Sequence, residues 1–245
     1  MYNILISFAL AALVGSGLYW GYWKGASGYA GYATLVASVV FVAAFFVLSR
    51  LFVKKLTAIM AEAEHELQAN RTDRAIKVLE KGLRYRHWQL YVTSQIHSQI
   101  GMIYYIKRDF AEAFEHLKKG LSRNWAAMGM LAICYMKRSK PKEMKKTFEK
   151  AVALTKNEPL LWNLYAFCMD KIGEHQQAIE IMERGLKKTS RDEKLEANLS
   201  ALREGRRMKM ENYGPLWYQF HLEKTGELFK MQVRSMQGRR KMVRR

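Results

Sequence analysis

Few residues in this sequence of 245 residues combine the types and spacing that catalysis or metal binding requires. The nearest candidate is a run in which Glu62, His65 and Glu66 would share one helix face, at positions i, i+3 and i+4. Such a face could hold a metal ion, but a solvated, charged helix face gives the same pattern. The sequence contains no HExxH motif, glycine-rich phosphate loop or nucleophile–base arrangement. We therefore expect a protein that is not an enzyme and uses no cofactor.

The two cysteines, Cys134 and Cys168, form no CxxC motif and have no neighbouring histidine cluster. Neither a zinc site nor a disulfide framework is supported by this spacing. Both residues lie at the same position of a 34-residue period, described below, so we expect helical packing to explain them. Two unpaired thiols also suit a reducing compartment.

Charge divides the sequence into two parts near residue 50. The only charged side chain in residues 1–49 is Lys24, so nearly all of the net charge of +19 lies later in the chain. Residues 4–23 and 30–49 are each close to the roughly 20 apolar residues that a membrane-spanning helix needs. A cleaved signal peptide is the alternative, but it would need a basic start and a shorter apolar core. We predict a two-helix transmembrane hairpin within residues 1–55.

The charges that flank the predicted hairpin indicate its orientation. The connection at residues 24–29 is short, so the two spans must be antiparallel. Arg50, Lys54 and Lys55 follow the second span at once, and positive charge stays on the cytoplasmic side of a membrane. We therefore expect both termini and all residues after 55 to be cytoplasmic, at a bacterial inner membrane.

Three glycines of the hairpin recur at every fourth residue: Gly17, Gly21 and Gly25. Small residues at this spacing let helices approach each other closely in lipid. Two interpretations remain open. The two hairpin helices pack on each other through these glycines, or the glycines dock against a larger membrane protein.

After residue 55 the sequence repeats itself, as it does in helical-repeat proteins. Four segments align, and each shows the apolar periodicity of two amphipathic helices joined by a turn. The segments begin at Leu56, Ser94, Trp125 and Pro159, and the last two starts (125 and 159) are 34 residues apart. A unit of two helices cannot bury its apolar face alone, so such units stack into a solenoid with a continuous core.

The fourth segment resembles the tetratricopeptide repeat. Trp162 stands in the large early position, Ala166 at the helix crossing and Gly173 in the turn between the helices. Ala178 and Met182 follow in the second small position and the bulky core position. The second and third segments share this pattern, through Gly101, Tyr104, Phe110, Ala113, Leu117, Gly120 and Leu121, and through Leu131, Ala132, Tyr135, Phe148 and Ala151.

Two departures from the repeat pattern affect the predicted packing. Met144 occupies a small position of the third segment, which should push its helices apart. Glu62 and Glu66 occupy core positions of the first segment, whose boundaries are therefore open. The resemblance implies four repeats over residues 56–192. We expect a capping helix over 193–212 and an amphipathic, basic tail over 213–245, which completes an all-α fold.

The resemblance also implies a concave face lined by part of the first helix of each repeat. Methionine and aromatic residues there suit an adaptable groove for a partner helix or an extended segment. The asparagine and basic residues with which chaperone-binding members of the family hold a C-terminal carboxylate are not found. The alternative for each predicted residue is a place in the core between repeats. The predicted groove residues are Gln95, Ser98, Met102, Tyr105, Met136, Lys137, Asn163, Phe167, Asp170 and Lys171.

The end of the sequence is strongly basic. From Arg203 onward, twelve Lys or Arg residues stand against four Glu residues. Three partners would suit this charge: an anionic membrane surface, an acidic protein or a nucleic acid. No recognised nucleic-acid-binding module accompanies it. The residues predicted to make this contact are Arg239, Arg240, Lys241, Arg244 and Arg245.

The sequence thus predicts a membrane-anchored scaffold whose cytoplasmic solenoid binds other proteins, including membrane proteins, and organises a complex. The layout looks like that of the anchored repeat subunits of bacterial exopolysaccharide export complexes. It also looks somewhat like the anchored subunit of cytochrome c maturation, although the repeats of that subunit lie outside the cytoplasm. The alternative is a membrane-tethered regulatory or nucleic-acid-binding protein that uses its basic tail. The oligomeric state is left open.

Overall fold

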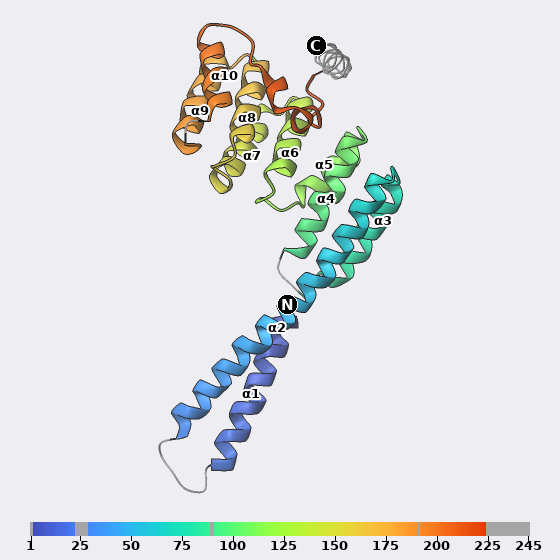
Figure 1. The fold of residues 1–245 in the computed structure, drawn as a ribbon, viewed down its shortest axis with the longest axis vertical. Helices are drawn as coiled ribbons and strands as arrows, with labels where there is room; N and C mark the ends of the chain where they lie inside the picture. The colour runs from blue at the N-terminus through green and yellow to red at the C-terminus, as the bar shows by residue number, and fades with distance from the viewer. Residues whose placement is uncertain (1, 23–28, 89–90, 191, 224–245) are drawn as a thin grey trace, which may run out of the picture. The chain divides into compact units, whose positions relative to one another are not determined.

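The computed structural model describes residues 2–22, 29–88, 91–190 and 192–223 (Figure 1). Within these ranges every regular element is a helix, so the predicted all-α class is confirmed. The chain divides into two compact units, residues 1–100 and 101–245, which are described separately. Helix α4 (Val92–Ile106) contributes residues to both units. Gly25 and the five basic residues predicted at the end of the tail lie outside the described residues.

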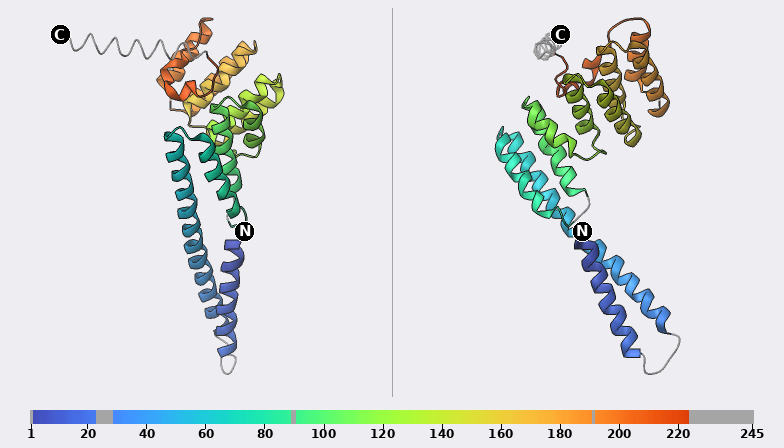
Figure 2. Two further views of the ribbon diagram at one scale, coloured as in Figure 1. Left: turned by 90° about the vertical axis from the view of Figure 1, so that its right-hand side faces the viewer. Right: turned by 180° about the vertical axis from the view of Figure 1, so that it is seen from behind.

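The first unit contains a pair of apolar helices, α1 (Tyr2–Tyr22) and α2 (Tyr29–Gln68). The views in Figures 1 and 2 agree that α1 lies beside the first half of α2. Among the described helices, one stretch, Tyr32–Gln68, is long and apolar enough to cross a membrane, and Tyr2–Leu18 is a shorter apolar helix. Large apolar side chains of both helices are exposed, among them Leu5, Phe8, Leu13, Val39, Val42 and Phe46.

Helix α2 is continuous over 40 residues. It joins the second apolar run to the first predicted repeat helix, because no glycine or proline occurs between residues 32 and 68 to end it. The predicted boundary at residue 55 therefore falls inside one continuous helix and does not mark the end of an element. The second half of α2 packs against α3 (Thr72–Gly82), and a short 3₁₀ helix, Leu83–Tyr85, follows.

Small residues form the contact between α1 and α2. A Cβ atom added at Gly15 would lie 3.2 Å from the Cβ of Ala37, and Ala11 and Ala33 are buried. A Cβ atom at Gly17 would meet no atom within 4 Å. Gly15 rather than Gly17 therefore faces α2, two residues before the predicted glycine series begins. Of the other two predicted glycines, only the helical backbone of Gly21 is described.

The second unit is a series of helix pairs. After the second half of α4 come α5 (Phe110–Lys118), α6 (Trp125–Lys137), α7 (Pro141–Leu154), α8 (Pro159–Lys171) and α9 (His175–Lys188). Helices α6 and α7 pack together, as do α8 and α9, and α6 contacts α8. Consecutive helix pairs are thus stacked in chain order, as the repeating sequence predicts.

Local sequence features set where these helices begin. The side chains of Asp109, Asn124 and Asp192 each accept a hydrogen bond from the backbone N–H three residues later, which caps α5, α6 and α10 (Glu193–Arg203). Proline is the first residue of α7 and α8, where no intrahelical N–H is needed. The turn between α8 and α9 contains Gly173 at φ +90°, a conformation that favours glycine.

Small residues permit close contacts between helices within this unit. A Cβ atom added at Gly185 of α9 would lie 2.8 Å from Cγ of Trp162 in α8. Met144 is completely buried at the position where a small residue is typical.

Cys134 and Cys168 are also buried, and burial raises the pKa of the Cys134 thiol to about 11. A thiol with a raised pKa is a poor nucleophile and metal ligand, which agrees with a packing role.

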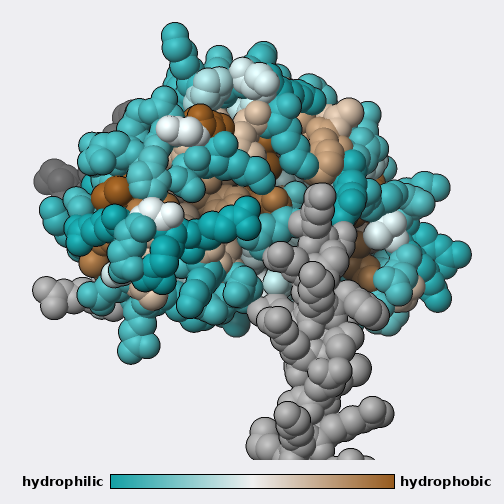
Figure 3. All heavy atoms as spheres, turned by 90° about the horizontal axis from the view of Figure 1, so that it is seen from above, coloured by the Kyte–Doolittle hydropathy of each residue, from teal (hydrophilic) through white to brown (hydrophobic). Residues whose placement is uncertain are grey.

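The helix that follows the repeats is shorter than predicted. Helix α10 ends at Arg203, and Gly205 adopts φ +66°, so the helix predicted over 193–212 stops after eleven residues. A short 3₁₀ helix, Met210–Tyr213, and helix α11 (Pro215–Tyr218) complete the described chain. Seen from above, the molecule presents a mainly hydrophilic face with smaller hydrophobic areas between the polar side chains (Figure 3).

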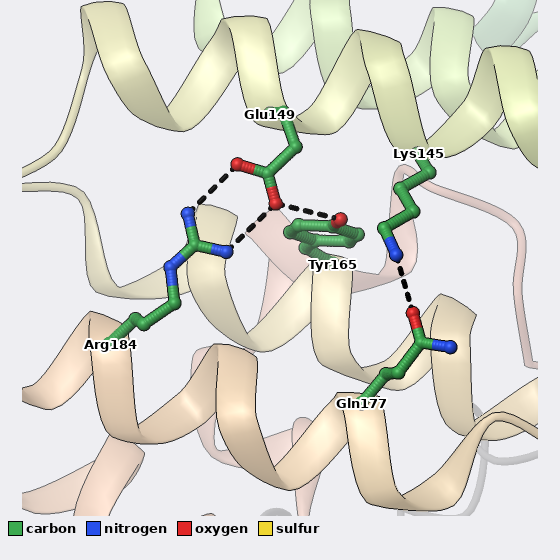
Figure 4. A network of polar contacts seen from close by, with 5 residues as sticks. All are labelled: Lys145, Glu149, Tyr165, Gln177 and Arg184. Atoms are coloured by element: carbon green, nitrogen blue, oxygen red, sulfur yellow. Dashed lines mark hydrogen bonds and ion pairs between the residues drawn. The ribbon is translucent and has the colours of Figure 1, made fainter.

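A polar network connects three consecutive helices (Figure 4). Arg184 of α9 donates two hydrogen bonds, of 2.9 and 2.8 Å, to the carboxylate of Glu149 in α7. The hydroxyl of Tyr165 in α8 donates to the same carboxylate at 3.0 Å. The Arg184 guanidinium holds the pKa of Glu149 below its usual range, chiefly through this hydrogen bonding. The network therefore stabilises the contact between the third and fourth repeats while Glu149 is ionised.

We expect Glu149→Gln to lower the free energy of unfolding by about 0.5–1 kcal/mol at pH 7, since the pair is partly exposed and screened. A carboxyl whose pKa is lower in the folded state stabilises the fold above its unfolded pKa of about 4.3. That stability is lost as the pH falls through the folded pKa. Urea unfolding of both proteins at several pH values should therefore show the difference vanish in acid. Glu180→Gln, at an exposed position of α9, is the control. A difference that persisted at pH 3 would contradict this role.

Candidate protein-interaction groove

The first helices of successive repeats form one side of the second unit. Helix α6 contacts α8, and α8 contacts α10. Residues at equivalent positions of these helices recur with the repeat period: Lys137 and Lys171 are 34 residues apart, and Asn163 and Asn198 are 35 apart. These helices, with the second half of α4, line the groove that the repeat pattern predicts.

The groove is occupied by the chain itself. Residues 208–223, here named the C-terminal segment, leave α10 through a short turn and run back across α8 and α6 toward α4 (Figure 1). Trp217 and Phe220 are almost completely buried there, as is Met210. The segment therefore shows how the groove holds a polypeptide.

Asparagines hold the first half of the segment. Asn198 accepts a hydrogen bond from the backbone N–H of Lys209 at 2.8 Å, and its amide donates to Asn163 at 2.8 Å. Asn163 in turn donates to the hydroxyl of Tyr213 at 2.7 Å. Lys194 donates to the carbonyl of Asn212 at 3.0 Å. Both asparagines are buried, so each satisfied polar atom avoids a desolvation cost.

Hydroxyl and ammonium groups hold the main chain of the second half. The hydroxyl of Tyr105 in α4 donates to the carbonyl of Phe220 at 2.7 Å, and burial raises the pKa of this phenol. The ammonium of Lys171 in α8 donates to the carbonyl of Leu222 at 3.0 Å. A raised phenol pKa keeps Tyr105 protonated and able to donate at all physiological pH values.

Two aromatic side chains of the segment fill the floor of the groove. The ring of Trp217 meets Phe167 of α8 edge to face, with centroids 4.8 Å apart. Phe220 lies beside Trp125 and over Gly129 of α6, where an added Cβ atom would be 3.4 Å from the Phe220 ring. Edge-to-face pairs of this kind add to the stability gained from burying apolar area.

Cations lie along the edge of the groove near the end of the segment. Lys137 places its ammonium 3.4 Å from the centre of the Phe110 ring, and burial lowers the pKa of Lys137. His221 stacks on Tyr105 and lies 3.2 Å from the carbonyl of Ile106. Burial also lowers the pKa of His221, and the nearby cations Arg108 and Lys137 lower it further, so the neutral ring is favoured.

A part of the groove remains open beside the segment. A cleft of about 650 Å³ is bordered by groove residues Phe167, Asp170 and Lys171. Its other wall consists of the C-terminal segment and the residue before it, through Arg207, Met208, Lys209, Glu211, Leu222 and Glu223. The cleft carries charges of both signs and is therefore suited to polar polypeptide groups.

The predicted groove residues have different outcomes. Tyr105, Asn163, Phe167 and Lys171 contact the C-terminal segment, and Asp170 borders the open cleft. Lys137 covers Phe110, whereas Met136 is partly buried against the core. Met102 accepts a hydrogen bond from Asn124. Gln95 and Ser98 belong to the first unit, where Gln95 is exposed and the buried hydroxyl of Ser98 donates to the carbonyl of Ser94.

Sequence reasoning missed three contributors to the groove. The sequence pattern predicts Asn198 and Lys194 only as parts of a capping helix, and it does not single out Gly129. The 35-residue spacing of Asn163 and Asn198 was the available indication for the first. The tail over residues 213–245 is predicted to be amphipathic, but nothing in its sequence shows that the groove would be its partner.

The possible metal site at Glu62, His65 and Glu66 gains no support from the described structure. Glu62 is exposed, and Glu66 lies 3.6 Å from the guanidinium of Arg71. Among the described residues, no group of three or more His, Cys, Asp or Glu side chains could hold a metal ion.

Comparisons with known proteins give likenesses in structure and none in sequence. No protein-family model matches the chain, and no curated protein sequence matches it. Among solved structures, the crystal structure of MamA protein is similar, with a TM-score of 0.47 and 19% sequence identity. The similarity covers 70% of this chain and 94% of MamA.

Proposed function

We propose that this protein is a membrane-anchored scaffold, in which a repeat domain of the tetratricopeptide type binds segments of partner proteins. The observation that carries the proposal is the way the groove holds a polypeptide. Tyr105, Lys171 and Lys194 donate to main-chain carbonyls, and Asn198 accepts from a main-chain N–H. Such contacts recognise any suitably placed backbone, while aromatic sites select side chains, which is the physical basis of peptide recognition.

The anchor in this proposal is the α1–α2 hairpin, spanning a bacterial inner membrane twice with both termini in the cytoplasm. The exposed apolar side chains of both helices support it, because such a large apolar surface would be unfavourable in water. With 21 helical residues, α1 is about 30 Å long at 1.5 Å per residue, which matches the thickness of a bilayer core.

Aromatic and basic residues gather at one end of the hairpin, which supports the proposed orientation. Phe52 stacks on Trp88 with centroids 4.4 Å apart, and Tyr2 meets Trp88 edge to face. The backbone N–H of Tyr2 donates to the carbonyl of His87 at 2.8 Å. Amphipathic rings favour the headgroup layer on either side of a membrane, and the cations favour the cytoplasmic side. The exposed cations nearby in sequence are Arg50, Lys54, Lys55, Arg84 and Arg86.

The scaffold function can be tested by purifying the full-length protein from nuclease-treated native membranes in mild detergent. We expect proteins to co-purify in fixed proportion and to be lost when Phe167 is replaced by alanine. Leu154→Ala, an exposed change on α7, is the matched control and should retain them. Recovery of the protein alone would sink the proposal. Partners that disappear with nuclease or with removal of residues 237–245 would instead indicate binding by the basic tail.

A further inference from the structure

We propose that the C-terminal segment, residues 208–223, is a built-in competitor that occupies the groove until a partner displaces it. The displacing partner is a protein segment of the same chemistry: two aromatic side chains three residues apart, followed by main-chain carbonyls that accept hydrogen bonds. The proposal rests on the proposed scaffold function, because it concerns the same groove.

The segment is attached to the repeats as a ligand would be, rather than as a further repeat. Its two helical elements, Met210–Tyr213 and α11, have four residues each and form no antiparallel pair with α10. Its described contacts with the groove run mainly between groove side chains and its own main chain or aromatic rings. Releasing the segment would therefore separate no helix pair, but it would expose the apolar part of the groove that Met210, Trp217 and Phe220 cover, and a displacing partner must cover it again.

The contacts define what a competing partner must supply. Tyr105 and Lys171 bind the carbonyls of residues 220 and 222, and any residue type provides a carbonyl there. Selectivity comes from the two ring sites, which hold Trp217 against Phe167 and Phe220 beside Trp125. An aromatic pair at spacing i, i+3 places both rings on one side of a helical turn. Here Trp217 lies in α11, and the turn that follows the helix brings Phe220 to the same side, with its backbone N–H donating to the carbonyl of Trp217 at 3.0 Å.

The connection to α10 is suited to opening. Residues 204–207 are exposed, and Gly205 at φ +66° separates α10 from the segment. The cleft of about 650 Å³ beside Phe167, Asp170 and Lys171 gives an incoming segment an unoccupied part of the groove to contact first. A partner can thus begin to bind before the chain's own segment has left completely.

A short tether makes the built-in segment a strong competitor. A tethered ligand acts at an effective concentration in the millimolar range, which falls roughly as the −3/2 power of linker length. A free peptide must compete against this concentration, so the groove of the unaltered protein should take up free peptide only weakly. Lengthening the linker should make the groove more accessible without changing any groove residue.

The test uses a fluorescent synthetic peptide with the sequence of residues 208–223 and measures its anisotropy with the full-length protein in detergent. We expect Trp217→Ala/Phe220→Ala, which weakens the built-in segment, to bind the peptide at least about tenfold more tightly than the unaltered protein does. A second variant carries about 20 Gly and Ser residues inserted between Arg206 and Arg207. It should bind the peptide about tenfold more tightly as well, by the length dependence of effective concentration.

Three controls locate the binding. Adding Tyr105→Phe to the long-linker variant removes one hydrogen bond and should weaken peptide binding about 3- to 10-fold. A peptide with alanine at the two aromatic positions should not bind. Leu216→Ala in the protein changes a side chain that is 56% exposed and should leave the affinity unchanged.

Helicity measured by circular dichroism shows whether each variant is folded. If the Trp217→Ala/Phe220→Ala variant is not folded, the long-linker variant alone decides the test. Failure of the peptide to bind the folded long-linker variant, or equal binding to the unaltered protein, would overturn the competitor proposal. These outcomes are separate from the scaffold test. If partners are lost with Phe167→Ala but no variant binds the peptide, the scaffold proposal stands and the competitor proposal is rejected. If the variants bind the peptide but no partners co-purify, the competitor proposal stands and the scaffold proposal is rejected.

Discussion

Replacing Phe148 with alanine is expected to lower the free energy of unfolding of the repeats by about 3–5 kcal/mol. Phe148 of α7 is completely buried, and its ring stacks on Tyr165 of α8 with centroids 4.8 Å apart. The substitution removes the stacking contact with Tyr165 and leaves a cavity between two repeats. Tyr165 would also lose the packing that orients its hydroxyl toward Glu149.

Urea unfolding followed by circular dichroism measures this loss. Leu154→Ala on the same helix is the control, because Leu154 is 48% exposed and should cost less than about 0.5 kcal/mol. Phe148→Leu should fall between the two. A loss below about 1 kcal/mol for Phe148→Ala would mean that the third and fourth repeats do not share a continuous core.

Leu10→Arg is expected to shift the membrane insertion of α1 by about 3 kcal/mol, or roughly 150-fold, because arginine near the centre of a span is strongly disfavoured relative to leucine. Leu10 lies midway along α1 and is exposed rather than packed on α2, so the substitution disturbs no described helix contact severely. Helix α1 is the more informative of the two proposed spans to test, since it is the shorter of the two apolar helices.

Labelling of a cysteine introduced at position 2 by a membrane-impermeant reagent reads out this effect in sealed inner-membrane vesicles and in intact cells. Because α2 remains as a span, the variant should stay in the membrane but lose the defined topology of the hairpin, so that position 2 becomes accessible to the reagent from outside intact cells. Tyr91→Arg, an exposed change outside the apolar helices, is the control and should behave as the unaltered protein does. If Leu10→Arg had no effect, α1 would not be a membrane span.

The helix pairs could be predicted from the sequence because their determinants are local. Asp109 and Asn124 each cap a helix, and Gly173 ends a turn with a conformation that other residues rarely adopt. The 3.6-residue periodicity then places Trp162 and Ala166 in the core without reference to any other segment. These features act over one or two turns of chain, and the sequence states them directly.

The boundaries that failed have equally local causes. The predicted division at residue 55 rested on a change of composition, but a change from apolar to amphipathic residues does not end a helix when no breaker is present. The predicted capping helix ran past Gly205, whose positive φ ends α10. Single glycines and prolines, rather than changes of composition, therefore decide where these helices end.

The occupant of the groove could not be predicted, because periodicity shows which face is concave but not what covers it. Tyr105 and Asn163 were predicted to face partners, and both are completely buried under residues of the same chain. Contacts between residues more than 100 positions apart, such as Tyr105 and Phe220, leave no periodic trace in one sequence. Three-dimensional placement was needed to find them.

The continuity of α2 has a mechanical consequence. Its second half extends past the apolar stretch as a rigid lever, because a helix without glycine or proline transmits rotation along its axis with little bending. In the proposed membrane setting, the 19 residues from Arg50 to Gln68 form an arm of about 27 Å between its first and last residue, at 1.5 Å per residue. A change of about 10° in the tilt of the span would then move the far end of the arm, and the helix α3 packed on it, sideways by about 5 Å. Bilayer thickness would thereby be converted into displacement of the first repeat.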